Sequence, residues 1–136
     1  MALFTVLLSL GQGGATHSVL AQKPNDNYGG RKTVKYTPGQ RLVLRIVNRS
    51  MNPLTLRTSF SSRSFSLIPG QQAQFQWAAV PDDFSVLFWD QSVQFLQAVV
   101  KKPNATTVRI ELHSSNRNGP DDGAVHFMFD GWVRVD

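Results

Sequence analysis

The sequence predicts an all-β protein, an antiparallel β-sandwich of about eight or nine strands. Three observations support this fold class. Short runs of alternating apolar and polar residues recur along the chain, turns rich in Pro, Gly, Asn and Asp separate them at intervals of about 8–12 residues, and no window has a helical period. The 136 residues, of which 41% are hydrophobic, are enough for one core and exclude a wholly disordered chain.

The N-terminal segment is expected to be a signal peptide covering residues 1–21. Its apolar run, residues 2–10, is too short to span a bilayer, and small side chains at Val19 and Ala21 predict cleavage between Ala21 and Gln22. No Lys or Arg precedes the apolar run, so either the true start lies upstream or the α-amino group is the only charge before it. The alternative is that residues 2–10 form a buried first strand. The prediction places the protein outside the cytoplasm, in a periplasm or secreted.

The rest of the chain is expected to hold a flexible lead-in over residues 22–31 and one β-sandwich domain over residues 32–136. The chain has no cysteine, which excludes disulfides, thiolate catalysis and Cys-containing metal centres. No apolar run reaches the ~20 residues of a membrane-spanning helix.

Four strands are expected before residue 80. The first covers residues 32–36 and ends at a Pro-Gly turn, and the second, residues 41–47, alternates apolar and polar side chains. The third, residues 54–60, follows an Asn-rich turn, and the fourth, residues 71–78, follows a second Pro-Gly turn and alternates apolar residues with glutamines.

Five more strands are expected after residue 80. Residues 84–89 and 92–100 are largely apolar on both faces and predict the two most buried strands, whereas residues 107–112 alternate. Residues 124–129 and 132–135 predict a hairpin around Asp130-Gly131.

Two registers of this hairpin remain open. A two-residue turn places Phe129 opposite Trp132, and Phe127 opposite Arg134, which the turn residues favour. A three-residue loop places the same phenylalanines opposite Val133 and Val135, which apolar matching favours. The predicted core consists of the inward-facing apolar residues: Leu42, Leu44, Ile46, Leu56, Phe75, Trp77, Phe84, Val86, Phe88, Phe95, Val108, Ile110, Phe127 and Phe129.

The order of turns and strands over residues 37–77 resembles that of immunoglobulin-like and cupredoxin-like sandwiches. Copper-binding cupredoxins carry a histidine after the Asn turn and a Cys/His/Met cluster near the C-terminus. Here the Asn turn leads into residues 51–54 (MNPL) and cysteine is lacking, so a blue-copper site is excluded and no cofactor is expected.

Charge is unevenly distributed along the chain. Residues 23–63 carry nine of the 14 basic residues and one of the nine acidic residues. If the strands at 41–47 and 54–60 pair as a hairpin, Arg41, Arg45 and Arg57 share one outer face, which could bind carboxylates or phosphates on an acidic protein or another anionic surface. The alternative is a solubilising face with no ligand. Nucleic acid is not expected, because aromatic residues are not interleaved with these arginines.

These patterns predict a non-enzymatic binding or structural module, because no constellation of acid, base and nucleophile is legible. The first alternative is a carbohydrate-binding module that stacks sugars on exposed tryptophan, with Trp132 as the candidate from the hairpin. The second is a small metal-dependent hydrolase using His113, His126 and nearby carboxylates, although no metal motif is present. The paired aspartates at residues 82–83 and 121–122 are expected to cap turns.

Overall fold

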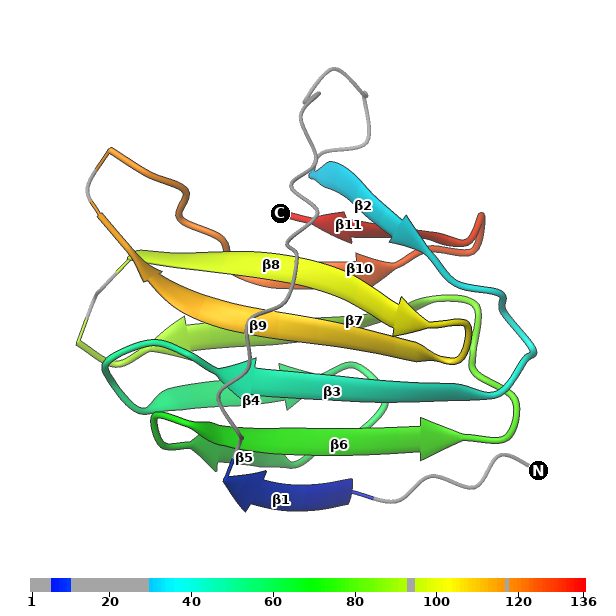
Figure 1. Ribbon diagram of the computed structural model, residues 1–136, viewed down its shortest axis with the longest axis horizontal. Coiled ribbons are helices and arrows are strands. Elements are labelled where there is room, and N and C mark those ends of the chain that lie inside the picture. Colours follow the sequence, from blue (N-terminus) through cyan, green and yellow to red (C-terminus); the bar gives the residue numbers. More distant parts are fainter. Residues whose placement is uncertain (1–5, 11–29, 93–94, 117) are drawn as a thin grey trace.

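The computed structural model describes residues 6–10, 30–92, 95–116 and 118–136, and of residues 6–10 it describes the backbone alone. The described residues form eleven strands (Figure 1) and no helix, hence no helix that could cross a membrane. The strands are β1 (Val6–Leu10), β2 (Arg31–Lys35), β3 (Leu42–Asn48), β4 (Leu54–Thr58), β5 (Ser64–Leu67), β6 (Gln71–Trp77), β7 (Phe84–Asp90), β8 (Phe95–Asn104), β9 (Thr107–Ser115), β10 (Ala124–Phe127) and β11 (Trp132–Val135).

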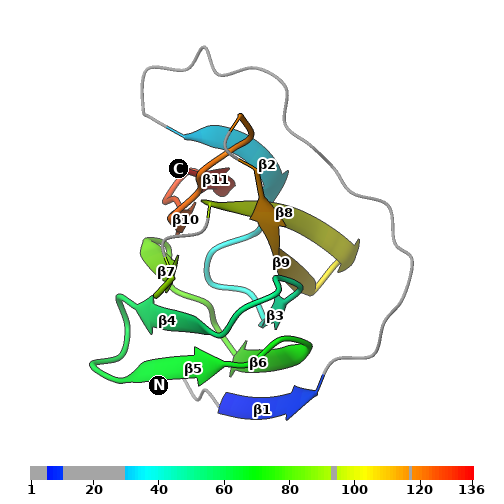
Figure 2. The same cartoon turned by 90° about the vertical axis from the view of Figure 1, so that its left-hand side faces the viewer.

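The strands form two sheets that pack face to face, as Figure 2 shows from the side. One sheet has the order β1-β6-β3-β9-β8 and the other the order β2-β11-β10-β7-β4-β5. Every pair is antiparallel except β3 and β9, which run parallel. The predicted β-sandwich is confirmed, and β1 and the four-residue β5 add to the nine strands that the sequence predicts.

The core lies between the two sheets and contains the alternating apolar residues of both. All predicted core residues are buried except Phe95, which is half-buried, and Phe129, which is 71% exposed. Aromatic rings fill the centre: Phe84 stacks on Phe127 with ring centroids 4.3 Å apart, and Phe60 meets Phe75 edge to face at 5.3 Å. Such ring pairs stabilise a core beyond their buried area.

The C-terminal hairpin has neither of the two expected registers. Phe127 pairs with Val133, and His126 with Arg134, so the loop consists of residues 129–131. Gly131 adopts a φ of 89°, and its amide donates to the carbonyl oxygen of Met128 at 3.0 Å. This register points Phe127 and Val133 inward together, and it leaves Phe129 at the exposed tip of the loop.

The apolar composition of β7 predicted burial on both faces, but only one of its faces is buried. Phe84, Val86 and Phe88 point into the core, whereas Leu87 and Trp89 point outward and are each 42% exposed. An apolar residue on the outer face of a central strand is available to a ligand or a partner.

The predicted leader contributes one described strand. Residues 6–10 form β1, which pairs antiparallel with β6 along one edge of the five-stranded sheet. The predicted cleavage site between Ala21 and Gln22, and the lead-in up to residue 29, lie outside the described residues.

Candidate functional site: the outer face of the six-stranded sheet

The predicted arginine face is divided between the two sheets. Strands β3 and β4 do not pair as a hairpin: β3 pairs with β6 and β9, and β4 pairs with β5 and β7. Arg45 lies on β3, with Arg41 just before it, whereas Arg57 lies on β4 in the opposite sheet. The expected common face is therefore wrong, because alternation specifies which side chains face the core but not which strand is the neighbour.

Arg57 borders a pocket of about 470 Å³ on the outer side of the six-stranded sheet. Its side chain is exposed and has no hydrogen bond or ion pair to another described side chain. The pocket is lined by this guanidinium group, four hydroxyl residues, one leucine and one histidine: Arg57, Thr58, Ser59, Ser61, Ser85, Leu87 and His126. A cation beside several hydroxyl groups suits an anionic ligand.

The polar groups of this pocket are held by cross-strand pairing. Ser85 on β7 lies directly opposite His126 on β10, and Ser85 Oγ shares a hydrogen bond of 2.7 Å with His126 Nδ1. Ser59 Oγ accepts the Ser85 amide at 2.9 Å. On the far side of the imidazole, Asp136 Oδ2 lies 3.8 Å from Nε2. Both nitrogens of His126 thus have polar neighbours, of which Ser85 makes the short contact.

The order serine, histidine, carboxylate resembles that of a hydrolase triad, but the surroundings favour binding. A nucleophilic serine needs amide donors at the position where the oxyanion develops. The Ser85 amide already donates to Ser59 Oγ, and the side chain of Asp136 is 64% exposed, so it orients the imidazole weakly. Arg57 can hold an anionic group in this pocket, whereas the Ser85 amide is not free to stabilise an oxyanion.

The other outer face, on the five-stranded sheet, carries a charge cluster centred on one buried carboxylate. Glu111 is surrounded by Lys101 Nζ at 3.1 Å, Arg109 Nε at 3.2 Å and His113 Nε2 at 3.2 Å. Burial alone would raise the pKa of Glu111, but the hydrogen bonds from Lys101 and His113 and the nearby positive charges lower it below its usual value. Arg45 is exposed, and its Nε donates to Gln74 Oε1 at 3.0 Å. The carboxylate of Glu111 and the Nε of Arg45 are thus already engaged within the fold.

The three tryptophans have different environments. Trp77 is buried in the core, and Trp89 is exposed on the outer face of β7, where it pairs with Thr55. Trp132, the tryptophan singled out from the sequence, is half-buried, and its ring has Lys32 Nζ and Lys35 Nζ 5.1 and 4.9 Å from its centroid. Two ammonium groups near one ring leave little of it for stacking on a sugar.

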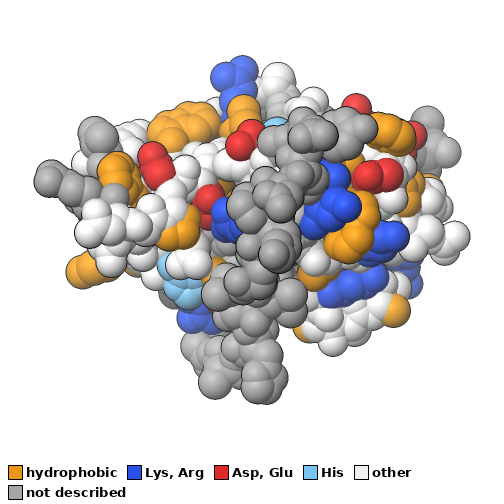
Figure 3. Space-filling view, turned by 90° about the horizontal axis from the view of Figure 1, so that it is seen from above, with side chains coloured by type: hydrophobic (Ala, Val, Ile, Leu, Met, Phe, Trp, Pro, Cys, Tyr) orange, Lys and Arg blue, Asp and Glu red, His pale blue; other side chains and the backbone are white. Residues whose placement is uncertain are grey.

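The lysines beside Trp132 lie on β2, at the upper edge of the six-stranded sheet in Figure 1. The view from above shows Lys and Arg side chains next to hydrophobic ones to the right of the centre (Figure 3). The positive charge of the N-terminal half thus gathers partly around an aromatic ring, in cation–π contacts.

The two histidines proposed as metal ligands lie in different sheets. His113 is on β9 and contacts Glu111, whereas His126 is on β10 and contacts Ser85. Within the described residues, no group of three or more His, Asp or Glu side chains could hold a metal ion. The structure therefore does not bring together the site that the hydrolase alternative needs.

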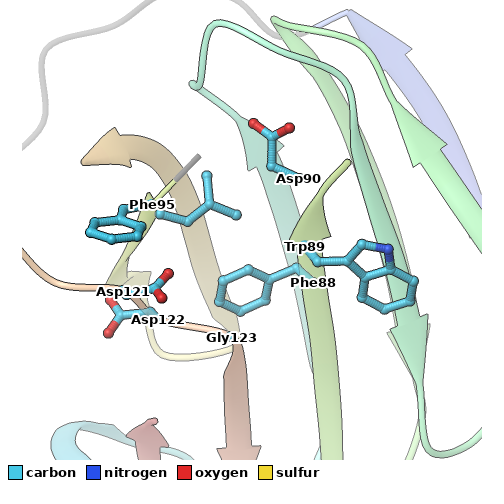
Figure 4. A pocket seen from close by; sticks show the side chains of 8 residues that line it. Phe88, Trp89, Asp90, Phe95, Asp121, Asp122 and Gly123 are labelled. Carbon is cyan, nitrogen blue, oxygen red and sulfur yellow. The ribbon is translucent and has the colours of Figure 1, made fainter. Parts of the chain in front are cut away.

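A second pocket, of about 250 Å³, opens at one end of the sandwich beside Asp90, Asp121 and Asp122 (Figure 4). Asp90 Oδ1 accepts the amide and hydroxyl of Ser92, and Oδ2 accepts Asn52 Nδ2. Burial would raise the pKa of Asp90, but these hydrogen bonds outweigh it and lower the pKa. Since its carboxylate is already engaged within the fold, Asp90 stabilises this end of the sandwich.

Asp122 was expected to cap a turn, and it does something different. Its carboxylate forms a bidentate ion pair with Arg31, at 3.0 and 2.8 Å, and Oδ2 also accepts the Ala98 amide at 2.8 Å. Neither this ion pair nor the contact between Ser85 and His126 has a local sequence signal, because each joins residues at least 41 positions apart. The folded structure brings the residues of each contact together.

No family model, no curated protein and no solved structure matches this chain.

Proposed function

We propose that this protein is an exported, non-enzymatic binding module that docks onto an acidic partner protein through the pocket at Arg57. The observation that carries the proposal is the position of Arg57 beside Ser59, Ser61, Ser85 and His126 in one pocket. A guanidinium group can bind a carboxylate with two parallel hydrogen bonds, and the serine hydroxyls can donate to the remaining lone pairs.

The surroundings of the pocket favour a protein as the partner. Leu87 lines the pocket, and Trp89 lies two residues further along β7, so two apolar side chains, each 42% exposed, flank the charged site. Protein interfaces commonly combine exposed aromatic or aliphatic side chains with arginine. An acidic segment that also carries apolar residues would be complementary to this surface.

The test uses a synthetic peptide rich in Asp and Leu as the probe, with the Asn-for-Asp version as its control. Arg57→Gln should weaken binding about tenfold, the loss of one charge-assisted contact. Arg45→Gln is the matched control, because Arg45 is also an exposed strand arginine but lies on the opposite sheet. Binding to the wild type should weaken steeply with salt, since exposed charges are screened over about 8 Å at physiological ionic strength. Equal loss in both variants, or none in Arg57→Gln, would refute the proposal.

Export is tested separately, by sequencing the N-terminus of the protein isolated from its native host. Cleavage of the leader predicts a mature chain that begins at Gln22. A chain that keeps residues 1–21 would contradict export by this route and would leave the binding proposal standing.

A second candidate function, glycan binding, is favoured by the exposure of Trp89. This ring lies on the outer face of β7 next to Thr55, a surface that could stack on a sugar. A neutral glucan oligosaccharide should then change the fluorescence of the wild type and of Trp132→Ala, but not of Trp89→Ala. No response of the wild type to a panel of neutral and anionic oligosaccharides would remove this candidate.

A further inference from the structure

We infer that strand β6 is a pairing edge, and that two copies of this chain join their β6 strands antiparallel when β1 leaves it. In the uncleaved chain this edge is occupied by β1, with Val6 opposite Phe75 and Leu10 opposite Gln71. Cleavage after Ala21, which the proposed function includes, would take β1 away with the leader. The outer backbone groups of β6 would then have no strand beside them.

The other edges of the described sheets carry features that prevent strand addition. Strand β8 contains Lys101, Lys102 and Pro103 near its end, where its register with β9 is irregular. Strand β2 contains three basic residues and a register shift opposite β11. Strand β5 has four residues. Charges, proline, bulges and short length are the devices by which proteins keep edge strands from pairing with other chains.

Strand β6 has none of these features. It has seven residues, the sequence QQAQFQW, and an unbroken register with both β1 and β3. It contains no charged residue and no proline. An uncharged, regular strand of this length pairs readily with another strand once its edge is open.

The sequence of β6 is complementary to itself, which favours a second copy as the occupant. In an antiparallel pair centred on Gln74, Gln72 faces Gln76 and Gln74 faces its own copy on the outer side of the sheet. Glutamine amides both donate and accept hydrogen bonds, so these pairs satisfy each other. On the inner side, the small Ala73 faces the large Phe75, which avoids a clash between two large side chains.

The test exposes β6 in the full-length chain and measures its association state by sedimentation velocity. Successive amides of a strand point to opposite edges, so one of the two amides at Leu7 and Leu8 faces β6. Proline has no amide hydrogen, so the double variant Leu7→Pro/Leu8→Pro removes a hydrogen bond from β1 to β6. The wild-type chain should sediment as a monomer and the double proline variant as a dimer at tens of micromolar. A double proline variant that stays monomeric while keeping its β-sheet circular dichroism would overturn the inference.

Two further changes in the double proline background separate β6 pairing from non-specific association. Gln74→Lys places like charges opposite each other at the centre of the pair and should restore the monomer. Gln97→Lys, on the opposite edge of the same sheet, should leave the dimer intact. Equal effects of the two lysines would count against pairing through β6.

Disulfide crosslinking tests the same pairing without the two prolines, which could themselves alter folding. The chain has no cysteine, so Gln74→Cys introduces a single thiol. Under mild oxidation, in protein from which the leader has been removed by its own host, two thiols lose their protons and two electrons to the added oxidant and form one disulfide between copies. Gln97→Cys is the control and should stay monomeric. A Gln74→Cys mature protein that forms no more covalent dimer than Gln97→Cys would overturn the inference.

Discussion

At the scale of single residues, buried polar side chains decide how the turns of this sandwich are held. Asn48, at the end of β3, is fully buried, and its Nδ2 donates to the carbonyl oxygens of Leu67 and Asn52 at 2.8 and 2.9 Å. Its Oδ1 accepts the Ser50 amide at 2.8 Å. One amide side chain thus joins the end of β3 to β5 and to the following turn.

Asn48→Ala should lower the free energy of unfolding by about 3 kcal/mol, because several buried polar groups lose their partners together. Urea denaturation measures this loss. Asn104→Ala is the matched control: Asn104 also accepts the amide of the residue two positions later, but it is exposed, so its removal should cost less than about 1 kcal/mol. Similar losses of unfolding free energy in the two variants would show that the burial of Asn48 does not determine how much it stabilises the fold.

Thr58 is a buried polar residue whose hydroxyl group, unlike the Asn48 amide, is not hydrogen-bonded to any described residue. Thr58→Val replaces this hydroxyl by a methyl group of the same shape and should raise the free energy of unfolding by about 1 kcal/mol. Thr33→Val makes the same change where Oγ1 donates to the Val133 carbonyl at 2.8 Å, and it should lower stability by a similar amount in the same urea titration.

At the scale of strands, β9 carries the only glutamate of the chain, and its ionisation links stability to pH. Glu111 is buried to 4% exposure against Lys101, so the ionised carboxylate stabilises the folded state and its pKa is lowered there. This contribution is complete above the unfolded pKa of about 4.3 and is lost as the pH falls through the lower folded pKa.

Glu111→Gln should therefore cost about 3 kcal/mol at pH 7, because it leaves the Lys101 and Arg109 charges without their carboxylate. The difference from the wild type should shrink below about pH 4, where the wild-type carboxylate takes up its proton. Chemical denaturation at a series of pH values measures both effects. Asp83→Asn, at an exposed turn, should follow the wild type throughout, and a constant difference for Glu111→Gln would contradict the assignment.

The strands also show how far sequence reasoning reaches. Alternation specified which side of β3, β4 and β6 faces the core, because a period of two is local and burial acts on it directly. It did not specify that β3 pairs with β9 and β4 with β7, because partners are chosen by contacts far apart in sequence. Arg57 was therefore predicted as a candidate residue but grouped with the wrong neighbours. Its pocket is formed by the pairing of β4, β7 and β10 and by the loop after β4.

At the scale of the whole molecule, one ion pair ties the two sheets together at an open end. Arg31, at the start of β2 in the six-stranded sheet, donates through Nη1 and Nη2 to the Asp122 carboxylate. Its Nη2 also donates to the Ala98 carbonyl on β8 of the other sheet. Asp122 in turn accepts the Ala98 amide. Strand β8 is an edge strand of its sheet, and β2 is an edge strand of the other, so this network bridges two edges that no ladder connects.

A double-mutant cycle on this bridge should show a coupling energy of about 2 kcal/mol between Arg31→Gln and Asp122→Asn. The pair is bidentate, and the Asp122 side chain is 5% exposed, so water replaces the lost contact poorly. Asp122→Asn should also speed hydrogen exchange at the Ala98 amide, since that amide loses a charged acceptor, while exchange at the Ile110 amide in the centre of the same sheet should stay slow. The double-mutant cycle measures the coupling between Arg31 and Asp122. The exchange rates show whether its loss loosens β8 at Ala98. Additive losses with unchanged exchange at Ala98 would mean that this ion pair does not link β2 to β8, and that their own ladders with β11 and β9 and the core between the sheets hold them in place.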